Sequence, residues 1–185
     1  MVKLGFIGAG TVGTALSVKL SRAGYPIVAV SSRSRTSAKK LAQAIAGCLP
    51  AGSNQDVADT AELVFVTTPD DVIASAVSQV RWHEGQSVVH CSGADSTDIL
   101  EPARKAGACV GCFHPLQTFA DARRAMENIP GSTFALEAEE PLLTELKDMA
   151  NALDAYWIEL KASDKVLYHA SAVIACNYLV TLVKL

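Results

Sequence analysis

Short apolar runs alternate along the chain with longer segments in which apolar residues recur at helical spacing. Apolar runs of this length, bounded by turn residues, are typical of strands buried on both faces. Strands separated by helical segments favour a parallel sheet with helices on both sides. The pattern predicts an α/β fold with a doubly wound, mostly parallel sheet, whose strands cover residues 2–7, 27–30, 48–49, 61–67, 86–91, 108–113, 132–136 and 156–160.

The segments between these runs predict helices over residues 14–20, 36–46, 54–60, 69–80, 96–105 and 139–153. We expect Thr68 to cap the fourth of them and Pro69 to take its first helical position. Ser96 can cap the fifth in the same way. In sheets of this type ligands bind beyond the C-terminal ends of the strands, so the residues that follow the runs are the first candidates for a site.

A glycine-rich turn follows the first apolar run directly, at Gly8-Ala9-Gly10-Thr11-Val12-Gly13. Strand, turn and helix in this order are typical of a dinucleotide-binding Rossmann unit. Gly8 allows a tight turn, Gly10 lets the backbone approach a pyrophosphate, and Gly13 lets the helix pack closely on the strand. The pyrophosphate then lies on the free N–H groups at the start of the helix.

The end of the second strand indicates which dinucleotide is bound. A site for NAD usually places Asp or Glu there, to hold the ribose 2′-hydroxyl. This chain has Ser31, Ser32, Arg33 and Arg35 instead, and the guanidinium groups suit a 2′-phosphate. We therefore expect NADP rather than NAD.

Two further strand ends are expected to line the cofactor. The first comprises Thr67, Thr68 and Pro69, and the second comprises Cys91, Ser92 and Gly93. We expect Ser92 and Gly93 to bring the backbone close to the nicotinamide, and a plain turn is the alternative.

Composition and charge restrict the partners. Half of the 185 residues are hydrophobic and 19% are charged, which fits a soluble globular protein. The first 55 residues contain seven Lys or Arg and no Asp or Glu, which suits a polyanionic small molecule. Nucleic acid is not expected as a partner, because no aromatic residues interleave with the basic ones.

Five cysteines occur at spacings that suggest no disulfide framework, and we expect a cytoplasmic protein. Cys109 and Cys112 lie three apart in a predicted strand, so they should point to opposite faces rather than form a redox or metal pair. His83 and His90 have no partner at the spacing of metal ligands, and no metal is expected.

The terminal segment from Val166 to Val183 is apolar nearly all round. Its length approaches a membrane span, but polar residues such as His169 and Asn177 interrupt it. We expect a helix buried by other helices, which the continuing chain or a second subunit would supply.

Three residues are candidates for catalysis. Lys165 and His169 share one helix face with Ala172 and Cys176, and they could present an ammonium and an imidazole to one cleft. Hydride transfer at a carbonyl needs a proton donor or acceptor on the oxygen. The alternatives are a solvated helix start for Lys165 and a hydrogen-bonded core histidine for His169. His114 either lines the nicotinamide pocket or bonds a backbone carbonyl.

Residues 5–13, 90–94, 111–119 and 168–173 together carry a resemblance. On these stretches the chain resembles the NADP-dependent oxidoreductases related to 6-phosphogluconate dehydrogenase and pyrroline-5-carboxylate reductase. More closely, it resembles a Rossmann-like family with a C-terminal domain of unknown function. In the 6-phosphogluconate dehydrogenase relatives, the linking helix carries a Lys and, four residues on, an Asn. The resemblance implies that Lys165 matches the Lys, whereas His169 stands in place of the Asn.

The resemblance implies an NADP-binding Rossmann domain over residues 1–160. Residues 161–185 would then be the first helix of a truncated all-helical domain that binds substrate and forms a homodimer. Two hypotheses follow. The first is an NADP-dependent oxidoreductase acting on a small carbonyl, imine or hydroxy acid, and the second is a non-catalytic NADP-binding sensor or scaffold.

Overall fold

A computed structural model describes residues 1–117 and 119–174, and its centre is a single sheet of eight strands. The strand order is β3-β2-β1-β4-β5-β6-β7-β8. All neighbouring strands pair in parallel except β6 and β7, which are antiparallel. The strands are β1 Leu4–Ile7, β2 Ile27–Ser31, β3 Leu49–Pro50, β4 Leu63–Val66, β5 Ser87–His90, β6 Cys109–Leu116, β7 Thr133–Ala138 and β8 Tyr156–Glu159.

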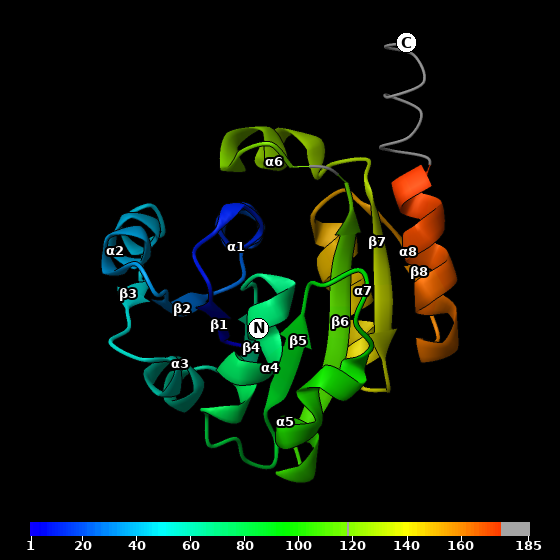
Figure 1. The fold of residues 1–185 in the computed structure, drawn as a ribbon. Coiled ribbons are helices and arrows are strands. Elements are labelled where there is room, and N and C mark those ends of the chain that lie inside the picture. Colours follow the sequence, from blue (N-terminus) through cyan, green and yellow to red (C-terminus); the bar gives the residue numbers. More distant parts are fainter. Residues whose placement is uncertain (118, 175–185) are drawn as a thin grey trace.

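Helices cover both faces of this sheet (Figure 1). They are α1 Thr11–Arg22, α2 Arg35–Gln43, α3 Asn54–Thr60, α4 Asp70–Ser78, α5 Glu101–Lys105, α6 Ala122–Asn128, α7 Leu142–Ala152 and α8 Lys165–Val173. Short 3₁₀ turns at η1 Thr97–Leu100 and η2 Ala162–Asp164 lead into α5 and α8.

The core consists of two hydrophobic clusters, one on each face of the sheet. The first joins side chains of α1, α2, α6 and α7, such as Leu16 and Leu146, to strand residues such as Phe6. The second joins side chains of α3, α4 and α5, such as Ile73, to strand residues such as Ile7. Because successive strand residues point to opposite faces, Phe6 and Ile7 belong to different clusters. The doubly wound sheet predicted from the sequence is confirmed.

Several details differ from the sequence prediction. Strand β6 continues through His114 to Leu116, because the antiparallel partner β7 pairs with it over that length. Helix α6 was not predicted; Asp121 caps it by accepting a hydrogen bond from the Arg124 amide. Thr68 does not cap α4, because Pro69 takes the N-cap position and no side chain bonds the first turn.

The C-terminal part of the described chain is not purely helical. Strands β7 and β8 extend the same sheet, and only then does the chain enter α8 at Lys165. The second half of the predicted apolar helix, including Cys176 and Asn177, lies outside the described residues. Across the two described ranges, no helix combines the length and apolar character that a membrane crossing requires.

Candidate functional site

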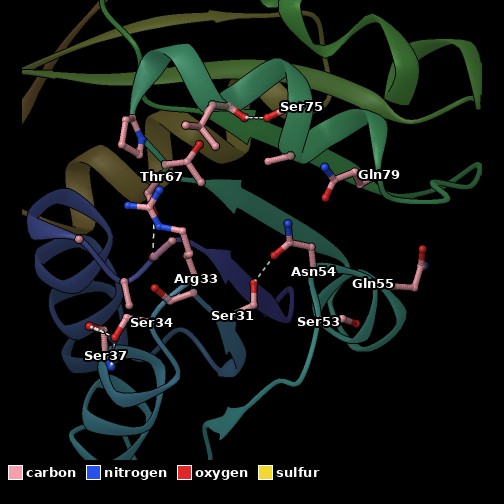
Figure 2. Close-up of a pocket in the computed structure, with 18 of the residues that line it drawn as sticks. Ser31, Arg33, Ser34, Ser37, Ser53, Asn54, Gln55, Thr67, Ser75 and Gln79 are labelled. Atoms are coloured by element: carbon pink, nitrogen blue, oxygen red, sulfur yellow. Dashed lines mark hydrogen bonds between the residues drawn. The ribbon is translucent and has the colours of Figure 1, made fainter.

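A cavity of about 670 Å³ lies beyond the ends of β1, β2 and β4 (Figure 2). Glycine and hydroxyl-bearing residues dominate its wall, and Arg33 is the one ionisable residue among the described residues that line it. Nine of the predicted cofactor residues line it: Gly8, Ala9, Gly10, Ser31, Ser32, Arg33, Thr67, Thr68 and Pro69. Of the other predicted residues, Thr11, Val12 and Gly13 form the first turn of α1 beside it.

The glycines occupy positions where a side chain would clash or intrude. Gly8 has φ of +120°, and an added Cβ would lie 2.7 Å from the Thr67 carbonyl. A Cβ on Gly13 would lie 2.4 Å from both the Gly8 carbonyl oxygen and Thr67 Oγ1. Gly10, by contrast, faces open space. These positions agree with a close helix–strand contact beside a turn that is accessible to a ligand.

The two threonines after β4 complete this wall. Thr67 Oγ1 donates to the Gly8 carbonyl oxygen at 2.9 Å, which ties the ends of β1 and β4 together. Thr68 Oγ1 is buried and has no hydrogen-bond partner among the described residues. An unpaired buried hydroxyl is costly, so this group is suited to a bound polar ligand.

At the end of β2 the cavity wall consists of Ser32, Arg33, Ser34 and Ser37. Ser34 Oγ accepts hydrogen bonds from the amide and the hydroxyl of Ser37, which fixes the start of α2. Arg35 is exposed as the first residue of α2, and it is not among the described residues that line the cavity. Of the two predicted arginines, the cavity therefore includes one.

Sequence reasoning missed the wall formed by residues 52–55. Ser31 Oγ donates to Asn54 Oδ1 at 2.7 Å, which leaves the Asn54 amide nitrogen on the side away from Ser31 (Figure 2). Ser53 and Asp56 form a capping box at the start of α3, and their spacing could have located this turn.

The shape and chemistry of the cavity fit an NADP molecule. Open space in front of Gly10 and the uncapped start of α1 suit a pyrophosphate, because helix N–H groups remain free there. Arg33 and its neighbouring serines suit a phosphate on the ribose. The wall, as far as residues 1–117 and 119–174 form it, contains no acidic residue that would repel that phosphate.

A second polar cluster lies at the ends of β5 and β6. After β5 the chain forms a tight turn in which Ser92 Oγ accepts from the amides of Ala94 and Asp95 and donates to the Asp95 carboxylate at 2.8 Å. The Ser92 amide donates to Nδ1 of the buried His90. The predicted cofactor residues Cys91, Ser92 and Gly93 therefore belong to a hydrogen-bonded loop beside this cluster; they do not line the 670 Å³ cavity.

His114 and His169 converge on this loop. An added Cβ on Gly93 would lie 2.6 Å from His114 Nε2 and 3.0 Å from His169 Nδ1. His114 Nδ1 lies 3.2 Å from the Tyr168 hydroxyl, so this side chain bonds a phenol rather than a backbone carbonyl. His169 Nδ1 is buried and has no hydrogen-bond partner among the described residues, so the alternative of a hydrogen-bonded core histidine finds no support at that nitrogen.

Two histidines of this cluster, His90 and His114, are neutral at neutral pH. Burial, with the Lys165 ammonium as a smaller cause, lowers the pKa of His114 to about 4. The same causes lower the pKa of His90 to about 3. Burial also raises the pKa of the Cys112 thiol to about 11, so Cys112 is a protonated core residue.

Lys165 is 1% exposed, which excludes the solvated helix start. Its Nζ donates to the Asp95 carbonyl oxygen and lies 3.3 Å from Glu137 Oε2. The described residues of the predicted helix face, Lys165, His169 and Ala172, are buried or half-buried. Glu137 was missed, although an acidic residue in an otherwise apolar strand is a signal that could have found it.

Cys109 and Cys112, the two cysteines that lie three residues apart, are both on β6. Cys109 is exposed and Cys112 is buried on the same strand, so the two point to opposite faces as expected. Both are free thiols. Among residues 1–117 and 119–174, no group of three or more His, Cys, Asp or Glu side chains could hold a metal ion.

Comparison with known proteins defines the class of this fold. The model of the Rossmann-like domain matches residues 1–115, and the chain belongs to this family. A second model, of the domain of unknown function DUF2520, matches residues 132–185. The resemblance noted in the sequence is thereby confirmed. No curated protein matches the chain in sequence.

Solved structures share the fold over nearly the whole chain. A protein from Bacteroides fragilis, provisionally described as an NADP oxidoreductase, is 27% identical, with a TM-score of 0.80 over 98% of this chain and 69% of its own. A reductive aminase from Aspergillus terreus, in complex with NADPH and ethyl-5-oxohexanoate, is 15% identical, with a TM-score of 0.77 over 98% of this chain and 63% of its own.

A 1-pyrroline-5-carboxylate reductase from Streptococcus pyogenes is 18% identical, with a TM-score of 0.73 over 96% of this chain and 66% of its own. The chain thus spans about two thirds of the length of these three proteins. At under 25% identity, the aminase and this reductase are evidence for the fold alone.

Proposed function

We propose that the protein is an NADP-dependent oxidoreductase that transfers a hydride between nicotinamide and a small carbonyl, imine or hydroxy acid. The observation that carries the proposal is the pairing of two features at the same edge of one sheet. A cavity walled by glycines and Arg33 lies at the ends of β1, β2 and β4, and a polar cluster with the neutral His90 and His114 lies at the ends of β5 and β6. The NADP oxidoreductase and reductase names of similar folds support it.

The chain offers a place for each part of the cofactor. Gly8, Gly10 and the start of α1 would hold the pyrophosphate, and Arg33 with Ser32 would hold the 2′-phosphate. Cys91, Ser92 and Gly93 would lie beside the nicotinamide, which supplies or accepts the hydride when bound. Arg35 lies outside the cavity wall, so it would contribute to NADP binding only through the long-range effect of its charge.

His114 and His169 are the proposed catalytic residues. When the Tyr168 hydroxyl donates to His114 Nδ1, the ring hydrogen lies on Nε2, the nitrogen that faces Gly93. A neutral imidazole can then donate a hydrogen bond to a carbonyl oxygen or an imine nitrogen and polarise it. Lys165 would contribute to the electrostatics of the site through its ammonium group, which donates a hydrogen bond to the Asp95 carbonyl oxygen.

Helix α8 is proposed to begin a helical domain that completes the substrate cleft. Its outer side exposes Val166, Leu167 and Ile174, which are 77%, 74% and 60% accessible. Large apolar side chains exposed together on one helix favour a partner surface. We propose that residues 161–185 lead into this domain and that it forms a homodimer.

Calorimetric titration of the full-length protein with NADPH and NADH tests the cofactor. We expect NADPH to bind at least tenfold more tightly, and tighter binding of NADH would contradict the role of Arg33. Hydride transfer, followed through NADPH absorbance over a panel of ketones, imines and hydroxy acids, tests the reaction. Tight NADPH binding without turnover of any substrate would favour a sensor or scaffold instead.

A further inference from the structure

A buried ion pair joins helix α8 to strand β7 beside the histidine cluster. Lys165 Nζ lies 3.3 Å from Glu137 Oε2, and the two side chains are 2% and 11% exposed. An ion pair so far from solvent repays its desolvation only when further hydrogen bonds hold its partners in place. Among the described residues, Glu137 Oε2 accepts no hydrogen bond and faces Lys165 alone, so the other contacts of the pair must hold it. The contacts of Glu137 therefore indicate what the pair holds in place.

Glu137 is oriented by a chain of donors that begins at the surface. Arg104 Nη2 donates to Thr97 Oγ1 at 3.0 Å, so the Thr97 hydroxyl hydrogen is directed to another acceptor. That acceptor is Glu137 Oε1, at 2.9 Å, which also receives the Thr97 amide at 3.2 Å. With Oε1 committed to Thr97, Oε2 is left to face the Lys165 ammonium.

Lys165 extends this chain to the loop after β5. Its ammonium donates to the carbonyl oxygen of Asp95, a residue of the turn that also contains Gly93. Gly93 is the position on which His114 and His169 converge, and His169 lies one helical turn after Lys165. The pair thus connects three separate segments: β7, the loop at 92–96 and α8.

We propose that Glu137 is a positioning residue of the catalytic site and acts through Lys165. By aiming the ammonium at Asp95, it sets the distance between the Gly93 loop and helix α8. That distance decides whether the imidazoles of His114 and His169 reach one substrate atom. This role rests on the proposed oxidoreductase function.

The test compares Glu137→Gln with Glu139→Gln in the full-length protein. Glu139 lies two residues after Glu137, directly beyond the end of β7. Its side chain is exposed, so it provides a matched control. For Glu137→Gln we expect kcat to fall about 10- to 100-fold while the Kd for NADPH changes less than twofold. Glu137→Asp should restore part of kcat, because it keeps the charge. The control should match the native protein in both quantities.

A second measurement does not depend on turnover. Amide hydrogen exchange at Ala94 and Asp95, whose N–H groups bond Ser92 Oγ, reports on the loop directly. Glu137→Gln should speed this exchange at least tenfold, whereas Glu139→Gln should not. The double variant Glu137→Gln with Lys165→Met removes both charges; it should recover thermal stability but not kcat.

These results separate the two proposals. A kcat within twofold of native in Glu137→Gln, or loop exchange unchanged in that variant, would overturn the role of Glu137. If the native protein reduces no substrate of the panel, the proposed function fails, while the exchange experiment still decides whether Glu137 orders the loop.

Discussion

The two sites lie at opposite ends of the edge of the sheet where the parallel strands have their C-terminal residues, and these two ends are built by different means. The cavity at β1, β2 and β4 is formed by glycines, hydroxyls and the backbone, and Arg33 is the single ionisable side chain that the described part of the chain contributes to it. The cluster at β5 and β6 is formed by ionisable side chains that are largely removed from water, such as His90, His114 and Lys165. The first end provides space and free N–H groups, and the second provides a fixed polar network.

This difference determines how each end can fail. A cavity formed by backbone depends on the absence of side chains at its glycines. The addition of a methyl group at one of them is therefore its most damaging change. A buried polar network depends on every partner being present, because each unpaired group inside a protein is costly. Changes to shape should therefore damage the first end, and changes to protonation should damage the second.

Gly13→Ala should have the largest effect. Its Cβ would lie 2.4 Å from the Gly8 carbonyl oxygen and from Thr67 Oγ1, so α1 must move away from β1. Overpacking of this kind costs about 1–3 kcal/mol and sometimes more. We expect a loss of about 3 kcal/mol in the free energy of unfolding, measured by urea denaturation, together with loss of NADPH binding.

Gly10→Ala is the matched control for this change. Apart from its two chain neighbours, no described residue has an atom within 4 Å of its added Cβ, and its φ of −81° suits alanine. The variant should lose less than about 1 kcal/mol of stability, yet bind NADPH at least tenfold more weakly. Equal stability losses in the two variants would contradict the assigned glycine roles.

Acid should act mainly on the second end. Folding lowers the pKa of His90 to about 3 and of His114 to about 4, from an ordinary value of 6.5. Between pH 6.5 and 4 the unfolded chain therefore binds protons that the folded chain excludes. The contribution of the two histidines to the free energy of unfolding is fully present above pH 6.5. It falls with decreasing pH by about 1.4 kcal/mol per pH unit for each histidine.

The variant His114→Gln isolates one of these contributions. Glutamine keeps a polar side chain but does not titrate, so the slope of unfolding free energy against pH should become shallower by about 1.4 kcal/mol per unit. Denaturant titrations at pH 4.5, 5.5 and 6.5 would measure it. An unchanged slope would show that His114 is not held neutral by the fold.

The sequence predicted the first end well because its determinants are local. Gly8, Gly10 and Gly13 lie within six residues, and Ser31 to Arg33 follow the next strand directly. The eight strands were also predicted, since each is a short apolar run between turn residues. Helix α6 was missed because its sequence is polar, and only Ala125 is fully buried.

The second end could be predicted only in part. Lys165 and His169 were found from helical spacing, and His114 from its place after an apolar run. Their partners come from distant segments: Asp95 is 70 residues from Lys165, and Thr97 is 40 from Glu137. No local pattern encodes such contacts, because the sheet topology and the path of α8 create them.

The smallest single effect is expected for Arg35→Ala, in a comparison of the two arginines of the first end. Arg33 lines the cavity, whereas Arg35 is exposed on α2 outside its wall. A charge-assisted hydrogen bond to phosphate contributes about 1.5–3 kcal/mol, so Arg33→Ala should weaken NADPH binding by roughly 10- to 100-fold. Arg35→Ala should weaken it less than about fivefold, through long-range charge alone. Calorimetric titration with NADPH and NADH measures both, and the Arg33 effect should vanish for NADH, which lacks the 2′-phosphate. Equal losses for the two variants would mean that both arginines reach the nucleotide and that α2 shifts toward it on binding.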